Sequence, residues 1–119
     1  MSLQDEITRA IGAHGMWKTR LMMAIESGSS EFDPIKVCQD NQCDFGHWLH
    51  GATLQATDKA NPNYEVVRKL HTEFHKLTGE ILRLALAGKK QEALAQMAMG
   101  SRYATLSGEL TKAMMKWKG

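Results

Sequence analysis

The chain has 119 residues and a formal net charge of +2, and 43% of its residues are hydrophobic and 24% charged. This length suits one domain, residues 1–119, with one apolar core, and the composition argues against disorder and against a nucleic-acid-binding surface. The apolar runs are shorter than the roughly 18–20 residues of a membrane span. The N-terminal segment also lacks a secretory signal. We therefore expect a cytoplasmic protein, in which cysteines bind metal or stay buried more often than they form disulfides.

The first expected element is a long amphipathic helix over residues 3–27. Its apolar stripe repeats at alternating steps of four and three residues: Leu3, Ile7, Ala10, Trp17, Leu21 and Ala24. His14 falls inside this stripe. A buried histidine must be neutral and hydrogen-bonded, or must bind a ligand, because a buried charge is costly.

Residues 34–60 predict short helical turns and loops. Asp33 and Pro34 form a helix-start signal, with an N-cap followed by a proline at the first helical position. Gly46, Gly51 and the turn at residues 61–63 then interrupt the segment.

Two further helices follow. Apolar spacing predicts one from Tyr64 to Ala87, with His71 and His75 beside its stripe, and another from Lys89 towards Trp117. The last helix contains glycines that each cost about 1 kcal/mol relative to alanine, which suggests close packing against another helix or subunit. The small residues of this face are Gly100, Ser101, Ala104, Ser107 and Gly108. Together the elements predict an all-α fold, an antiparallel up-and-down bundle of the four-helix type with one short irregular helical connection.

The chemistry centres on His71 and His75. At a spacing of four residues, both imidazoles project from one helix face and can share a metal ion. Glu73 lies between them, two residues after His71, and is turned roughly 200° around the helix from it. This excludes the glutamate base of the zinc-protease helix, in which the acid directly follows the first histidine.

Two ligand sets can complete the site. One takes Cys38 and Cys43 with the two histidines, although 27 residues separate Cys43 from His71, far more than in a zinc finger. The other takes His14 in place of Cys38.

Three separated motifs resemble the chemoreceptor zinc-binding domain, a bacterial helical module. They are H-x-x-W at residues 14–17, C-x-F-G-x-W-L at residues 43–49 and H-x-x-F-H at residues 71–75. The glycine junction at residues 87–89, before the last helix, also resembles the family. The motifs occur in the family's order and span most of the chain.

This resemblance implies a zinc site formed by His14, Cys43, His71 and His75, without a ligand role for Cys38. Three imidazoles and a thiolate close a tetrahedral shell and leave no position for an activated water, so we expect a regulatory domain and no enzyme. The thiolate also couples metal binding to thiol oxidation. The family further implies zinc or oxidant sensing, a homodimer, and a chemoreceptor or a diguanylate cyclase as output partner in chemotaxis or cyclic-di-GMP signalling.

Two other functions remain open from the sequence. A hemerythrin-like protein would bind two irons, but no carboxylate lies at a convincing ligand spacing. A zinc hydrolase would use the three histidines and leave Cys43 outside the metal shell.

Other residues of the motifs have supporting roles. We expect Trp17 and Trp48 to pack around the site with hydrogen-bonded indoles. Asp44 is either a hydrogen-bond partner of a ligating imidazole or a helix cap. His47 and His50 are expected to be surface residues, with an accessory metal site as the alternative.

Overall fold

Helices make up most of the computed structural model, which describes residues 3–39, 43–51 and 56–118, without the side chains of Asp44 and His50. The helices are α1 (Leu3–Ser27), α2 (Pro34–Val37), α3 (Asp44–His50), α4 (Ala56–Lys59), α5 (Pro62–Leu86), α6 (Lys90–Met97) and α7 (Arg102–Lys118). This part of the chain contains no strand. The all-α bundle is therefore confirmed.

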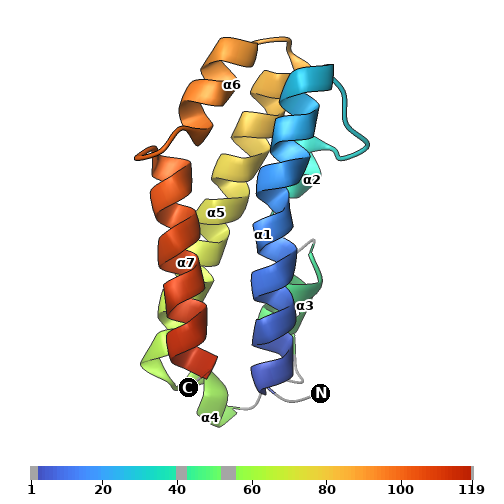
Figure 1. The fold of residues 1–119 in the computed structure, drawn as a ribbon. Helices are drawn as coiled ribbons and strands as arrows, with labels where there is room; N and C mark the ends of the chain where they lie inside the picture. Colours follow the sequence, from blue (N-terminus) through green and yellow to red (C-terminus); the bar gives the residue numbers. More distant parts are fainter. Residues whose placement is uncertain (1–2, 40–42, 52–55, 119) are drawn as a thin grey trace.

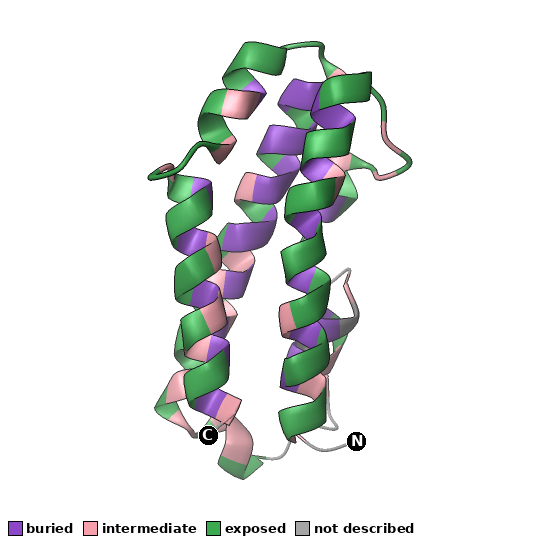
Figure 2. Ribbon diagram, viewed as in Figure 1, coloured by how far each residue is buried: buried purple, intermediate pink, exposed green. Residues whose placement is uncertain are grey.

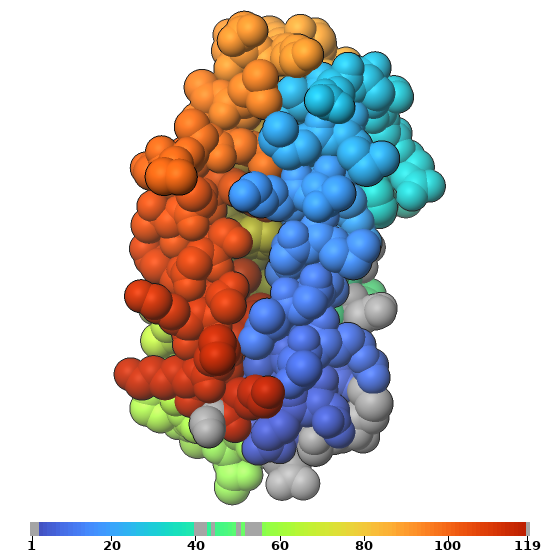
Figure 3. All heavy atoms as spheres, viewed as in Figure 1, coloured from blue at the N-terminus to red at the C-terminus, as the bar shows by residue number. Residues whose placement is uncertain are grey.

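The chain makes four passes along the long axis of the molecule (Figure 1). Helix α1 and helix α5 run in the same direction, and the irregular segment that carries α2, α3 and α4 brings the chain back between them. Helices α6 and α7 make the last, returning pass. On the face shown in Figure 3, α1 and α7 lie side by side, and the middle of α5 shows as a narrow strip between them. None of the described helices is both long and apolar enough to span a membrane.

Helix α1 has the predicted bounds and buries the predicted stripe from Ile7 to Ala24, His14 included, while Leu3 is half-buried. Its buried residues lie along one face of the helix (Figure 2). Its end is set by Gly28, which has a φ of 72° and whose N–H donates to the carbonyl of Ala24. Glycine adopts this left-handed conformation without the steric penalty of a side chain. The sequence therefore fixes which face of α1 meets the core and where the helix stops.

Helix α5 is the central element and packs against α1, α2, α6 and α7. It begins two residues earlier than predicted, because the Asn61 side chain accepts a hydrogen bond from the N–H of Asn63 and Pro62 occupies the first helical turn. Both His71 and His75 are buried on it. The site is thus built on the helix with the most neighbours.

The last predicted helix is interrupted, which the apolar spacing alone did not reveal. Helix α6 ends at Met97 and α7 begins at Arg102, and between them Gly100 has a φ of 82°. Gly100 therefore supplies a turn and is not a packing contact. A methyl group added at Gly108 would meet no atom within 4 Å, so close packing within this chain does not explain that glycine either.

One glycine does mark a close approach. A Cβ at Gly79 would lie 2.8 Å from the carbonyl oxygen of Pro34 and 2.9 Å from the backbone nitrogen of Cys38. Helix α2 therefore rests directly on the backbone of α5, and any side chain at residue 79 would push it away.

We expect Gly79→Ala to lower the free energy of unfolding by about 1–3 kcal/mol, because backbone atoms must move to admit the methyl group. The matched control is Gly108→Ala, which should raise it by about 0.5–1 kcal/mol since the helical glycine has open space around it. Urea unfolding of the two variants measures both effects. Equal stability of the two variants would contradict the packing of α2 on α5.

Candidate metal centre

Four side chains from three separate elements meet inside the bundle, near the middle of α1 and α5. His14 comes from α1, Cys43 from the N-cap of α3, and His71 and His75 from α5. One ligand atom from each lies within 4.8 Å of all the others. The structure therefore brings together the four residues of the predicted set, and Cys38 is not among them.

The distances between these atoms match a tetrahedral zinc shell. The Nε2 atom of His14 lies 3.1 Å from that of His71 and 3.4 Å from that of His75. The Sγ atom of Cys43 lies 3.4, 3.5 and 4.0 Å from the Nε2 atoms of His71, His75 and His14. Usual zinc–ligand bond lengths place tetrahedral corners about 3.4 Å apart for two nitrogens and about 3.6 Å apart for nitrogen and sulfur.

Backbone carbonyls fix the orientation of two of the imidazoles. The Nδ1 atom of His14 lies 2.8 Å from the carbonyl oxygen of Ala10, and that of His75 lies 2.9 Å from the carbonyl oxygen of Val37. A carbonyl only accepts, so Nδ1 carries the proton in both rings and both Nε2 atoms present lone pairs. Two lone pairs that face each other at 3.4 Å repel, and a cation between them turns the repulsion into attraction.

The thiol of Cys43 is placed by the start of α3. Cys43 is extended, with a φ of −92°, and its sulfur accepts a hydrogen bond from the N–H of Gly46 at 3.3 Å. Hydrogen bonds from backbone N–H groups at a helix N-terminus stabilise a thiolate, the form of cysteine that binds metal. The glycine and cysteine of the C-x-F-G motif thus act together at this cap.

The surroundings of the cluster shield the imidazoles from water and disfavour the charged form of His14. His71 is 0% exposed, His75 2% and His14 7%. Burial, and next the proximity of His75, lower the pKa of His14 to about 4, although the hydrogen bond to Ala10 acts in the opposite direction. Neutral imidazole is the ligating form, so this shift favours metal binding at neutral pH.

Two phenylalanines enclose the histidines. Phe45 packs edge-on against His14 and His71, with ring centroids 5.8 and 5.2 Å away. Phe74 packs in the same way against His14 and His75 at 5.4 and 5.9 Å. These rings exclude water from two sides of the cluster.

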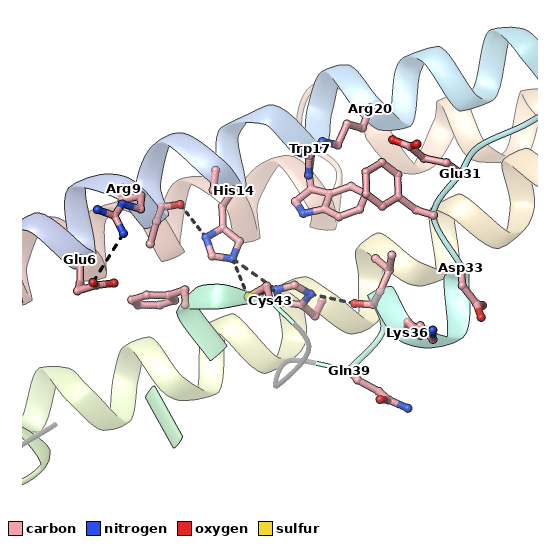
Figure 4. Close-up of a pocket in the computed structure, with 16 residues that line it drawn as sticks. Glu6, Arg9, His14, Trp17, Arg20, Glu31, Asp33, Lys36, Gln39 and Cys43 are labelled. Atoms are coloured by element: carbon pink, nitrogen blue, oxygen red, sulfur yellow. Dashed lines mark hydrogen bonds and ion pairs between the residues drawn. The ribbon is translucent and has the colours of Figure 1, made fainter. Parts of the chain in front are cut away.

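The cluster is reached from solvent on one side. A pocket of about 540 Å³ lies between α1 and the segment that carries α2 and α3, and His14, Cys43 and His75 form part of its wall (Figure 4). In this view His14 points from α1 towards Cys43, and Trp17 and Arg20 lie further along the same pocket. Cys43 is accordingly only partly buried.

The other residues of the motifs were expected to support the centre by packing or hydrogen bonding. Trp17 packs against Phe32, and Trp48 stacks on Phe45, as expected for aromatic packing. Neither indole N–H has a hydrogen-bond partner among the described residues. His47 is exposed, whereas the side chains of His50 and Asp44, and so their predicted roles, lie outside the description.

The geometry also bears on the alternatives. Glu73 is exposed and forms an ion pair with Arg102 of α7, so it faces away from the cluster as predicted. Among the described residues no carboxylate joins the four ligand atoms, as a di-iron centre would require.

Sequence reasoning missed the carbonyls of Ala10 and Val37. Ala10 was identified only as a core residue, and Val37 had no signal, because any residue supplies a carbonyl. The contact with Ala10 did have a signal in the sequence. A helical side chain leans over the preceding turn, so the ring of His14 can reach the carbonyl of the residue four positions earlier.

The helical bundle and the buried His₃Cys cluster together define a metal-binding domain of the zinc class. A family model described as the chemoreceptor zinc-binding domain matches residues 14–82, which include all four clustered residues. The chain belongs to this family, a family of regulatory zinc-binding domains and not of enzymes, and its cofactor is zinc. Comparisons with curated proteins and with solved structures gave no match.

We expect zinc removal to lower the thermal unfolding midpoint by on the order of 10 °C, because zinc binds the folded state and relieves the repulsion among buried lone pairs. Calorimetry before and after treatment with a chelator measures the change, and restoration by zinc but not by magnesium is the control. An unchanged midpoint would mean that the cluster is stable without a cation.

Proposed function

We propose that His14, Cys43, His71 and His75 bind one zinc ion as a four-coordinate His₃Cys site. The observation that supports this most directly is the convergence of three Nε2 atoms and one Sγ atom at tetrahedral spacing. The lone pairs of His14 and His75, whose Nδ1 protons face carbonyls, leave a cation as the natural occupant.

In this site the zinc ion ties three elements together. It joins α1, the start of α3 and α5, which are distant in sequence. Four protein ligands leave no coordination position for water, so the zinc has a regulatory role and no catalytic one. Gain or loss of the metal therefore changes how the helices are held, which is the property that a sensory domain needs.

The proposed role is that of a single sensory domain that responds to zinc or to oxidants and controls a chemoreceptor or a diguanylate cyclase. Membership of the family supports the signalling role. The pocket beside Cys43 supports the oxidant response, because solutes can reach the sulfur. We further propose a homodimer, with the exposed methionines as the apolar contact surface; those of α1 and α7 are Met16, Met22, Met23 and Met115.

We expect alanine substitution of Cys43 or His71 to weaken zinc affinity by roughly 100-fold or more, because each removes a direct ligand from a closed shell. The matched control is Cys38→Ala, which removes a half-buried thiol outside the cluster and should leave the affinity within about twofold. Competition with a chromogenic chelator measures all three. An equal loss at Cys38 would overturn the ligand set.

X-ray absorption at the zinc edge provides a direct test of the shell. The expected fit is one sulfur and three nitrogens, with one zinc per chain by native mass spectrometry. A shell without sulfur would leave Cys43 outside it and support the zinc hydrolase, whereas two irons per chain would support the hemerythrin-like alternative.

We expect hydrogen peroxide to release zinc. The Cys43 thiolate attacks one peroxide oxygen, the O–O bond breaks, and hydroxide leaves as the sulfur becomes a sulfenic acid, a weaker ligand. A zinc indicator follows the release, and Cys38→Ala should release zinc at the wild-type rate. Retention of zinc in oxidised protein would assign the sensory role to zinc concentration alone.

A further inference from the structure

Helix α3 is a short element fixed at both of its ends. It has seven residues, too few to be stable as an isolated helix, so its position depends on tertiary contacts. At its N-terminal end Cys43 belongs to the metal cluster. At its C-terminal end the carbonyl of Leu49 accepts a hydrogen bond of 3.0 Å from the Tyr64 hydroxyl at the start of α5.

A row of aromatic rings extends from the cluster to the far end of α7. Phe45, which contacts His14 and His71, stacks on Trp48 with ring centroids 5.6 Å apart. Trp48 in turn lies 5.6 Å from Trp117, and Trp117 packs edge-on against Tyr64 at 5.7 Å. Phe45 and Trp48 both belong to α3, so this helix connects the metal ligands to the last turn of α7.

The burial of Trp117 leaves the N–H group of its indole without a hydrogen bond to any described residue. The residue is 4% exposed, and its indole Nε1 is buried with no hydrogen-bond partner among the described residues. An unsatisfied buried donor destabilises the packed state, and hydration of the indole would remove that cost. The packed position of Trp117 therefore depends on its ring contacts, including the one with Trp48.

We propose that Trp48 and Trp117 are positioning residues that couple zinc binding at Cys43 to the docking of the C-terminal turn of α7. This inference rests on the proposed function, in which Cys43 is a zinc ligand. With zinc bound, α3 is held by its cap and Trp48 covers Trp117. When Cys43 loses the metal, α3 loses one of its two fixed ends, Trp48 withdraws, and the Trp117 indole becomes hydrated.

Coupling of this kind is reciprocal, so it predicts an effect of Trp117 on a metal that it does not touch. We expect Trp117→Leu and Trp48→Leu each to weaken zinc affinity about tenfold or more. Leu110→Ala is the control, because it removes a buried α7 side chain that takes no part in the ring contacts and should cost comparable stability. Its zinc affinity should stay within about twofold of wild type.

Nitrogen-15 NMR gives a second readout, which begins with the wild-type chain. The Trp117 indole signal is assigned by its loss in Trp117→Phe, which keeps an aromatic ring. Zinc removal from the wild-type chain should shift this signal and speed its exchange with water. In Trp48→Leu the signal should already resemble the zinc-free form and respond little to zinc.

The outcomes separate this inference from the proposed function. If the wild-type chain binds no zinc, or binds it without Cys43, the proposed function fails. If zinc is bound through Cys43 but Trp117→Leu keeps wild-type affinity and the Trp117 signal ignores zinc, the coupling alone is wrong. An equal loss of zinc affinity in Leu110→Ala would also overturn it, because any loss of stability would then be sufficient.

Discussion

The structure depends on one electrostatic constraint, the convergence of three imidazole nitrogens and a thiol sulfur inside a water-poor core. The hydrogen bonds from Nδ1 of His14 and His75 to backbone carbonyls direct the lone pairs of both rings inward, where they repel one another. In the proposed site, a divalent cation replaces this repulsion with four bonds. Because the four proposed ligands come from α1, α3 and α5, the proposed site links zinc affinity to the stability of the fold.

Secondary structure prepares the site before any metal binds. His71 and His75 lie one turn apart on α5, the helix that packs against the most other helices. The helical turn before His14 provides the carbonyl that orients its ring. The carbonyl that orients His75 comes from Val37, so the placement of α2 matters as well. Gly79 allows α2 to rest on the α5 backbone and thus brings that carbonyl within 2.9 Å of the ring. Gly79, which has no side chain to bind a metal, therefore helps to orient the ring of His75.

The cluster combines rigid and adaptable ligands. The three histidines sit on the two longest helices, whereas Cys43 caps a helix of seven residues, which is too short to be stable without tertiary contacts. The pocket also reaches the sulfur. The chemically most reactive of the four proposed ligands is thus carried by the shortest of the three elements that supply them, and through Phe45 and Trp48 the same element contacts the end of α7. Such an arrangement suits a domain whose output is a change in helix position.

The long helices, the burial of His14 within an apolar stripe and the pairing of His71 with His75 follow from the sequence pattern, because helical periodicity sets which side chains share a face. Together with the family motifs, this pattern also identified the four clustered residues. Spacing alone left open which cysteine joins the histidines, because the separation of Cys43 from them along the chain says nothing about the path that brings α3 back to α5. The family motifs indicated Cys43, and the fold brings it to the histidines. Only the tertiary structure decided that the last helix breaks at Gly100 and that Val37 orients His75. Backbone conformation and carbonyl contacts are common to all residues, so their roles arise from packing and leave no pattern in the sequence.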